Sequence, residues 1–341
     1  MSSTIHNILL VRTDRIGDVV LSLPMLPILK KHFPNSRISV FVRNYTKELV
    51  QRHPNVDEVL LWDEAKNWRE YVSLLKKKKF DIAILPYPRF ELAAIIFFAG
   101  IPVRVGTGYR WYSFFFNRKI YEHRKDAKRH EAEYNVNLLQ AIGITNSEPL
   151  KFDYVVSENA KTKVENEFLK QGIKLNEPFA VLHPGSGGSA RDWSLTNFAL
   201  LANELYSTFH FQIIFTGGAN EKELVQTVVN SVQVPSHSFV GTFNLEELAV
   251  VYSKAKVFIS NSTGPLHIAA MMGTPVAAFY PPIIQCSPMR WGPYTMKKKI
   301  FVADNKQCSL CKGGVCQSNL CMEQITVQQV VASVKELLNA Q

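Results

Sequence analysis

Residues 179–188 read FAVLHPGSGG, a short apolar run followed by a glycine-rich loop, and this stretch decides the fold class. A run of five mostly apolar residues that ends in turn residues is typical of a buried strand. Residues 197–206 then place apolar side chains at helical spacing. A strand, a loop and a helix in this order predict a parallel sheet with helices packed against it.

The same alternation extends outward in both directions. Apolar runs predict earlier strands at residues 8–11, 38–42, 58–61 and 80–85, and later strands at residues 211–216, 257–260 and 276–280. Helices are expected at residues 19–32, 47–52 and 327–338, and a polar helix at residues 157–172. We therefore expect an α/β protein with two Rossmann-like domains in tandem.

The length and composition agree with two domains, because 341 residues with 46% hydrophobic content can bury two cores. The polar helix near residue 160 marks the expected boundary. The predicted division is an N-terminal Rossmann-like domain at residues 1–160, a C-terminal Rossmann-like domain at residues 161–324 and a C-terminal helix at residues 325–341.

Positive charge is concentrated in the first half of the chain. The formal net charge is +10, and residues 1–150 carry 23 Lys and Arg against 15 Asp and Glu. Residues 151–341 carry 16 against 14. A nucleic acid, an anionic membrane surface and a phosphorylated glycolipid would each suit such a surface.

Residues 109–119, YRWYSFFFNRK, interleave aromatic and basic side chains as an interfacial segment does, although the same rings could instead fill the N-terminal core. The longest apolar run, residues 92–103, is shorter than the roughly 20 residues that a membrane-spanning helix needs. The first residues lack the pattern of an export signal. We expect a cytoplasmic protein and, if these rings form an interfacial segment, peripheral contact with an anionic membrane.

The loops beyond the carboxyl ends of the strands are the candidate site, because ligands of open parallel sheets bind there. Residues 260–267, SNSTGPLH, end a strand and open a helix whose first backbone N–H groups would face an anion. Thr263 adds a hydroxyl, and Gly264 lets a phosphate approach the backbone. Residues 184–189 form a second donor-rich loop, with Arg191 beyond it. Together the loops predict a diphosphate site, although each alone could be an ordinary turn or helix cap.

The sequence lacks two common nucleotide signatures. It contains no GxxxxGK[ST] motif, and the first strand leads into residues 12–18, RTDRIGD, rather than into a GxGxxG turn. A P-loop NTPase and a nicotinamide dehydrogenase are therefore disfavoured. Asp18 begins a helix, where it is either a cap or a carboxylate that accepts a proton from an acceptor hydroxyl.

Four segments in order resemble glycosyltransferase family nine, the ADP-heptose:lipopolysaccharide heptosyltransferases. They are residues 12–24, residues 183–193, Gly217-Gly218 followed by Glu221, and residues 260–267. The resemblance implies the GT-B fold, in which two Rossmann-like domains face each other across a cleft, the first binding the acceptor and the second the donor. It also implies transfer of heptose from ADP-heptose to a lipopolysaccharide core or related glycan. The anomeric carbon would be inverted without a catalytic metal or other cofactor.

The resemblance also assigns roles to single residues. Asp18 falls on the family's proposed general base, and Arg191 on a basic position that contacts the donor phosphates. Glu221 falls near the residue that holds the ribose hydroxyls, and Phe243 lies where a side chain packs near the adenine. The expected donor-binding residues are Ser186, Gly187, Glu221, Thr242, Phe243, Ser262, Thr263, Gly264, Pro265 and His267. The expected acceptor-binding residues are Arg15, Lys128, Arg129 and His130.

Ser262 departs from the family pattern, because well-studied relatives carry there an Asp that is thought to contact the heptose. This departure keeps open a transferase of the same fold that uses another nucleotide sugar. A non-catalytic protein that binds an anionic glycan or a nucleic acid is a further alternative. The sequence shows no recognition-helix or RNA-binding signature, so we expect no nucleic-acid partner.

Four cysteines form a close C-x2-C-x4-C-x4-C pattern in the loop at residues 308–321. Such pairs often hold zinc or iron, and a reducing cytoplasm disfavours disulfides. The alternatives are a structural zinc or iron site and four free thiols in a glycine-rich loop. The candidate ligands are Cys308, Cys311, Cys316 and Cys321, and a metal bound there would brace the loop without taking part in catalysis.

Overall fold

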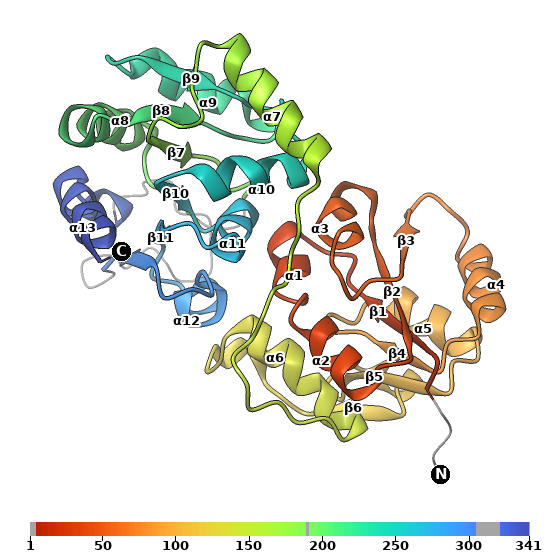
Figure 1. Ribbon diagram of the computed structural model, residues 1–341. Coiled ribbons are helices and arrows are strands. Elements are labelled where there is room, and N and C mark those ends of the chain that lie inside the picture. Colours follow the sequence, from red (N-terminus) through yellow and green to blue (C-terminus); the bar gives the residue numbers. More distant parts are fainter. Residues whose placement is uncertain (1–4, 189–190, 305–320, 341) are drawn as a thin grey trace. The chain divides into compact units, whose positions relative to one another are not determined.

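The computed structural model describes residues 5–188, 191–304 and 321–340 in two compact units (Figure 1). Unit 1 comprises residues 1–124 and 129–155, and unit 2 comprises residues 125–128 and 156–341. The units thus divide after Val155, shortly before the boundary predicted at residue 160. Each unit contains one parallel sheet of six strands in the Rossmann order, which confirms the predicted α/β class.

Unit 1 is built on the strand order β3-β2-β1-β4-β5-β6. The strands are β1 (Asn7–Val11), β2 (Arg37–Arg43), β3 (Glu58–Trp62), β4 (Ile82–Ile84), β5 (Val103–Thr107) and β6 (Arg118–Ile120). The helices are α1 (Ile16–Val20), α2 (Met25–His32), α3 (Glu48–Gln51), α4 (Trp68–Lys78), α5 (Phe90–Phe98) and α6 (Glu131–Asn137). Consecutive residues Ile8 to Val11 are at most 1% exposed, as expected for a strand covered on both faces.

The helix predicted at residues 19–32 is two helices in the structure. α1 ends at Val20, and α2 begins at Met25 directly after Pro24. Proline lacks the N–H that would continue the helical hydrogen bonds, so the chain turns before it. Pro27 is tolerated because it lies in the first turn of α2, where N–H groups have no partner within the helix.

Unit 2 repeats the topology with the order β12-β11-β10-β7-β8-β9. The strands are β7 (Phe179–His183), β8 (Gln212–Phe215), β9 (Ser236–Ser238), β10 (Val257–Asn261), β11 (Val276–Tyr280) and β12 (Lys298–Val302). The helices are α7 (Glu158–Lys170), α8 (Leu195–Phe209), α9 (Lys222–Ser231), α10 (Leu245–Lys254), α11 (Gly264–Met271), α12 (Pro288–Trp291) and α13 (Val327–Asn339).

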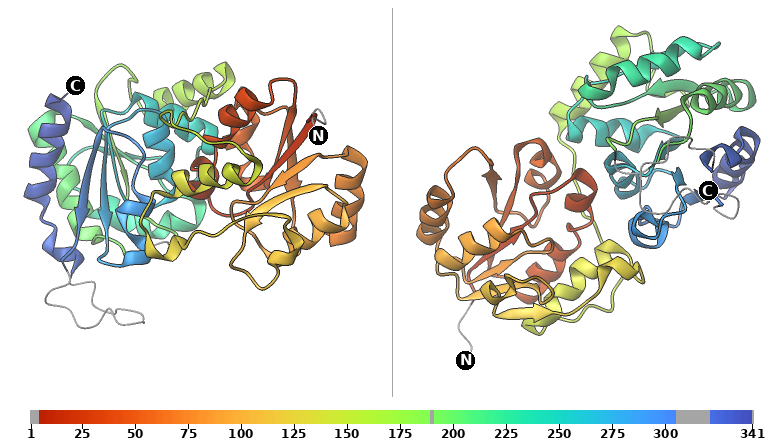
Figure 2. Two further views of the ribbon diagram at one scale, coloured as in Figure 1. Left: turned by 90° about the horizontal axis from the view of Figure 1, so that it is seen from below. Right: turned by 180° about the vertical axis from the view of Figure 1, so that it is seen from behind.

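The C-terminal helix α13 belongs to the core of unit 2 (Figure 2). It packs beside α8 and β12, and its side chains Val330 and Val334 are fully buried. Trp193, also fully buried, donates its indole N–H to the carbonyl of Ile325 at 2.8 Å. This bond ties the segment before α13 to the end of the loop that follows β7.

In both sheets the strand order reverses at one position, which lies between the first and fourth strands of each unit. β1 pairs with β4 in unit 1, and β7 pairs with β10 in unit 2. The loops after such neighbouring strands diverge and leave room for a ligand. In unit 2 these two loops are the segments predicted to bind a diphosphate.

Candidate active site

The start of α11 has the arrangement of an anion site. Thr263 stands at its N-cap in an extended conformation, and its side chain makes no capping hydrogen bond within the described structure. Gly264 opens the helix and Pro265 follows in its first turn. The remaining first-turn N–H groups lie at the positive end of the helix dipole, where an anion is stabilised. Thr263 and Ser262 are less than 10% exposed, so water would screen little of this interaction.

Asn261 joins the two diphosphate loops from the end of β10. Its side chain is fully buried. The amide Nδ2 donates to the carbonyl of Pro184 at 2.6 Å, and Oδ1 accepts from the N–H of Trp193 at 2.8 Å. The two partners lie at the two ends of the loop after β7. A single side chain therefore fixes both ends of this loop beside the start of α11.

Glu221 binds one glycine of the same loop and one glycine of the loop after β8. One carboxylate oxygen accepts from the N–H of Gly187 at 3.2 Å, and the other accepts from the N–H of Gly218 at 2.8 Å. A Cβ at Gly185 would collide with the Glu221 carboxylate, so a larger residue here would displace that carboxylate. Glu221 is thus brought to the predicted donor loop, and its contact with ribose hydroxyls stays a prediction.

A buried polar chain lies behind Glu221. His183 Nε2 is 3.6 Å from the Glu221 carboxylate, and Nδ1 is 3.0 Å from the hydroxyl of Thr216. Burial lowers the pKa of His183 to about 4, although Glu221 acts in the opposite direction. The imidazole is therefore neutral at neutral pH, and it packs close to the carboxylate while its hydrogen-bond partner is the Thr216 hydroxyl.

Two ionisable side chains end the loop after β7. Arg191 is partly buried, and Asp192 follows it. Burial raises the pKa of Asp192 to about 6, with the Ser186 hydroxyl favouring the ionised form and Glu221 opposing it. Asp192 was not predicted as a site residue, because a carboxylate beside a phosphate loop is unexpected from sequence alone.

The predicted adenine-side residues lie in the next loop of unit 2. The N–H of Gly241 donates to the carbonyl of Gly217 at 3.0 Å, which brings Thr242 and Phe243 beside the glycines near Glu221. The ring of Phe243 packs on Phe239 with centroids 5.1 Å apart and is 9% exposed. His267 is 5% exposed on α11. The roles of these side chains toward a donor stay predictions.

In unit 1 the loop after β1 builds a network of charges around Arg12. This side chain is 1% exposed and pairs with Asp14 at 3.1 Å, with Asp18 at 2.5 Å and with Glu131 at 3.7 Å. Burial opposes the charge on Arg12, but the three carboxylates raise its pKa above the ordinary value. Arg124 adds a second cation, 2.5 Å from Glu131. Asp18 is 18% exposed and is held in one orientation, so a hydroxyl group can reach it.

Asp14 is the second carboxylate of this network. Burial raises its pKa to about 6; Arg12 acts against this shift and Asp18 adds to it. Neither Arg12 nor Asp14 was predicted as a site residue, although both belong to the quoted RTDRIGD segment. Only the folded chain shows that Arg12 turns inward.

The predicted acceptor residues do not form one cluster of described contacts. Arg15 is exposed at the start of α1. His130 caps α6, where its Nδ1 accepts from the N–H of Ala132 at 3.2 Å. Arg129 lies 3.7 Å from Glu122 and Lys128 3.9 Å from Asp126. His130 thus has a structural contact of its own, and acceptor binding by the four residues stays a prediction.

The predicted metal site lies mostly outside the described residues. Cys308, Cys311 and Cys316 are not described, and Cys321 is buried. In the described part of the chain, His, Cys, Asp and Glu side chains form no group of three suited to a metal. Among the same residues, no helix is both long and apolar enough to cross a bilayer.

Comparison with known proteins decides the family. The model of glycosyltransferase family 9 (heptosyltransferase) matches residues 68–321, well over half of the chain. The chain belongs to glycosyltransferase family 9. It is therefore a glycosyltransferase, and the family expected from the four sequence segments is confirmed.

Relatives of this family 9 chain match over nearly its full length. A Haemophilus influenzae protein provisionally named a glycosyltransferase is 26% identical over 341 residues and 96% of each chain. Lipopolysaccharide heptosyltransferase 2 of Salmonella typhimurium is 25% identical, over 97% of this chain and 98% of that protein. These matches include both units of the structure.

Two solved structures share the fold of the chain. The family 9 glycosyl transferase of Veillonella parvula DSM 2008 is 22% identical with a TM-score of 0.84, covering 100% of this chain and 99% of that one. The E. coli ADP-heptose lipopolysaccharide heptosyltransferase II is 23% identical with a TM-score of 0.82, covering 98% and 99%. The two Rossmann-like units thus have the GT-B fold class, and the cleft predicted between them stays a prediction.

Proposed function

We propose that this family 9 glycosyltransferase transfers heptose from ADP-heptose to a lipopolysaccharide core or a related glycan. One observation carries the donor side of the proposal. Asn261 fixes a glycine-rich loop beside the start of α11, and in the described structure no side chain caps that helix start. This arrangement suits a diphosphate. Relatives named lipopolysaccharide heptosyltransferase support heptose and the acceptor class.

The reaction we propose is a direct displacement with inversion. The acceptor hydroxyl oxygen attacks the anomeric carbon while Asp18 accepts the hydroxyl proton. The bond between the anomeric carbon and the diphosphate oxygen breaks, and the electron pair leaves with ADP. Arg12 holds the Asp18 carboxylate in position through its ion pair. The products are the glycosylated acceptor, ADP and one proton now on Asp18.

The leaving diphosphate gains negative charge as the bond breaks. We propose that Arg191 and the backbone N–H groups of the two loops stabilise this charge, so that no metal or other cofactor is required. Fixed donors of this kind act without reorganisation at the moment of reaction. Arg191→Ala should weaken donor binding and lower turnover on the order of 10²-fold.

A second nucleotide sugar remains the alternative, and Ser262 is the observation that favours it. Ser262 has a neutral hydroxyl that hydrogen-bonds the side chain of Tyr280, so it offers no carboxylate to a sugar. An uncharged side chain here would suit a donor sugar with a different pattern of hydroxyls. Membership of an enzyme family disfavours the other alternative, a non-catalytic protein that binds anionic glycans or nucleic acid.

Thermal stabilisation by a panel of nucleotides tests the donor. A ligand that binds only the folded state raises the melting temperature, so ADP-heptose and ADP should stabilise the protein more than UDP or GDP and their sugars. Arg191→Ala should reduce this stabilisation. Stronger stabilisation by a UDP or GDP sugar would replace ADP-heptose with that donor. We also propose that the protein is cytoplasmic and acts where a membrane presents a lipid-linked acceptor.

A further inference from the structure

Unit 1 exposes a continuous set of aromatic rings drawn from three segments. α4 contributes Trp68, α5 contributes three Phe side chains, and the chain around the short 3-10 helix Ser113–Phe115 contributes two more rings. Their exposed fractions run from 39% to 74%, with Trp111 the most exposed. This aromatic patch consists of Trp68, Phe90, Phe97, Phe98, Trp111 and Phe114.

Ring contacts connect the patch from one end to the other. Trp111 stacks on Phe90 with ring centroids 5.0 Å apart, and Trp68 lies 5.8 Å from Phe98. Between these ends, Phe115 contacts four rings of the patch at 4.3 to 6.4 Å. Phe115 itself is only 6% exposed. The patch is therefore a surface layer on the core of unit 1, and large exposed apolar patches mark interaction sites.

The charge around the patch identifies its partner. Residues 66–119, which contain all six rings, carry 11 Lys and Arg against 3 Asp and Glu. Two of the cations lie over rings of the patch: the Arg69 guanidinium is 5.7 Å from the Trp68 ring, and that of Arg104 is 5.2 Å from Phe97. Arg110 is exposed and directly precedes Trp111. An aromatic surface mixed with basic side chains is complementary to a negatively charged lipid headgroup layer.

We propose that the aromatic patch docks unit 1 on an anionic membrane surface. The rings enter the headgroup region, where aromatic side chains are favoured, and the basic side chains meet lipid phosphates. The proposed function supplies the reason for docking, because a glycolipid acceptor is presented at such a surface. The docking itself needs neither donor nor acceptor, so the two proposals can fail separately.

The test is co-sedimentation of the full chain with vesicles of phosphatidylcholine containing phosphatidylglycerol, with pure phosphatidylcholine vesicles as comparison. The wild-type protein should bind the anionic vesicles at low salt and lose binding as salt screens the charges. Trp111→Ser with Phe114→Ser should weaken binding at least about tenfold by removing two exposed rings. Arg69→Gln with Arg110→Gln should also weaken binding at least about tenfold, since each basic residue near the surface contributes roughly a fivefold factor.

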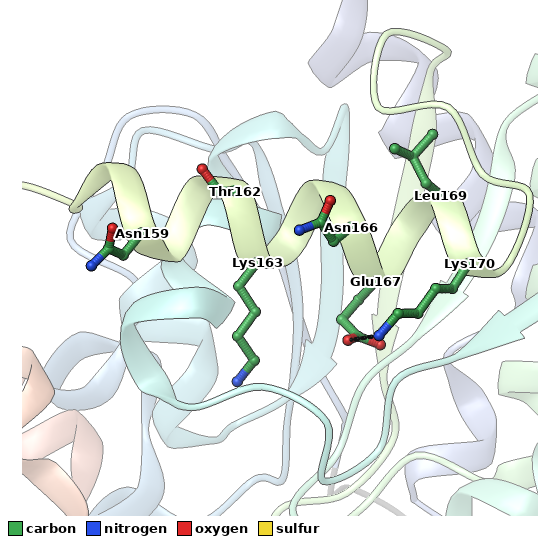
Figure 3. Close-up of a pocket in the computed structure, with 7 residues that line it drawn as sticks. All are labelled: Asn159, Thr162, Lys163, Asn166, Glu167, Leu169 and Lys170. Carbon is green, nitrogen blue, oxygen red and sulfur yellow. Dashed lines mark hydrogen bonds and ion pairs between the residues drawn. The ribbon is translucent and has the colours of Figure 1, made fainter.

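A matched control removes an equally exposed apolar side chain and a cation elsewhere. Leu169 and Lys170 are the last two residues of α7 in unit 2, and Leu169 is 67% exposed (Figure 3). Leu169→Ser with Lys170→Gln should bind vesicles within about twofold of the wild type. All variants change exposed or half-exposed side chains, and their melting temperatures would confirm that they fold.

Two outcomes would overturn the proposal. The first is a wild-type protein that stays in solution with anionic vesicles at low salt, or ring variants that bind as well as the wild type. The second is self-association without vesicles that Trp111→Ser with Phe114→Ser abolishes, which would make the patch an interface between copies of the chain. Binding of ADP, measured in parallel, should be unchanged by the ring substitutions and reports separately on the proposed function.

Discussion

Replacing Asn261 should weaken ADP binding by more than the accompanying loss of folding stability explains. Asn261→Ala removes the partners of the Pro184 carbonyl and the Trp193 N–H, both in buried residues. A buried polar group left without a partner costs about 1–3 kcal/mol, so the two together should lower the free energy of unfolding by about 2–6 kcal/mol. At about 2–4 °C per kcal/mol for a domain of this size, the melting temperature should fall by about 4–24 °C.

The same substitution frees both ends of the loop that we propose binds the diphosphate. ADP should therefore bind Asn261→Ala at least about tenfold more weakly, because the loop must be ordered on binding. Isothermal titration calorimetry of the folded variant with ADP measures this directly.

Asn203→Ala is the matched control, because Asn203 Oδ1 accepts a single bond from the N–H of Gln233 at 2.9 Å, outside the described contacts of the donor loops. It should lower stability slightly and leave ADP affinity unchanged. If Asn261→Ala bound ADP with wild-type affinity, the proposed role of Asn261 in fixing both ends of the loop would be refuted.

Three further substitutions test other parts of the molecule. Asp18→Asn should lose on the order of 10²-fold or more in turnover with donor affinity nearly unchanged. The structure does not make Asp18 the cap of α1, because Arg15 stands at the N-cap, so near-normal turnover would leave Asp18 only its ion pair with Arg12. Gly185→Ala places a methyl group against the Glu221 carboxylate, so ADP affinity should fall in calorimetry, and an unchanged affinity would contradict the observed packing. Burial lowers the pKa of His53 to about 4, so the unfolded chain takes up a proton near pH 6.5 that the folded chain does not. Stability should therefore fall as the pH drops from about 6.5 toward 4, and His53→Gln should flatten that part of the urea-unfolding profile; equal slopes would count against it.

Much of the fold could be predicted from the sequence because parallel strands are short apolar runs. Residues 8–11 and 179–183 are buried on both faces, so every position favours an apolar side chain. The short strands β6 and β9 were not predicted, since their residues are mostly polar and partly exposed. Residues 92–103 form one apolar run in the sequence but cover most of α5 and the first residue of β5, and periodicity does not separate the helix from the strand.

The position of the donor loops could be predicted, but their connection could not. Loops at the carboxyl ends of neighbouring parallel strands lie at the same edge of any such sheet. The two hydrogen-bond partners of Asn261 lie 68 and 77 positions before it in the chain, and no local sequence pattern indicates such distant contacts. The charges around Arg12 were missed for the same reason, because Glu131 reaches it from a helix more than a hundred residues later.

The aromatic segment at residues 109–119 fits both sequence interpretations in part: some of its rings are in the core and others are exposed, as in an interfacial segment. Tyr112, Phe115 and Phe116 are buried in unit 1, as the core interpretation expected. Trp111 and Phe114 are exposed, as an interfacial segment requires. The chain here is an irregular turn with a short 3-10 helix, so neither a helical nor a strand period sorts the rings in advance.

The most direct test of the proposed function is transfer itself. The purified chain is incubated with ADP-heptose and a lipopolysaccharide acceptor that lacks heptose, and the acceptor is analysed by mass spectrometry. The proposal predicts that the acceptor gains the mass of heptosyl residues while ADP is released in equal amount, and that Asp18→Asn largely abolishes both. An acceptor that gains a sugar only from another nucleotide sugar, with ADP-heptose left intact, would contradict the assignment of the donor.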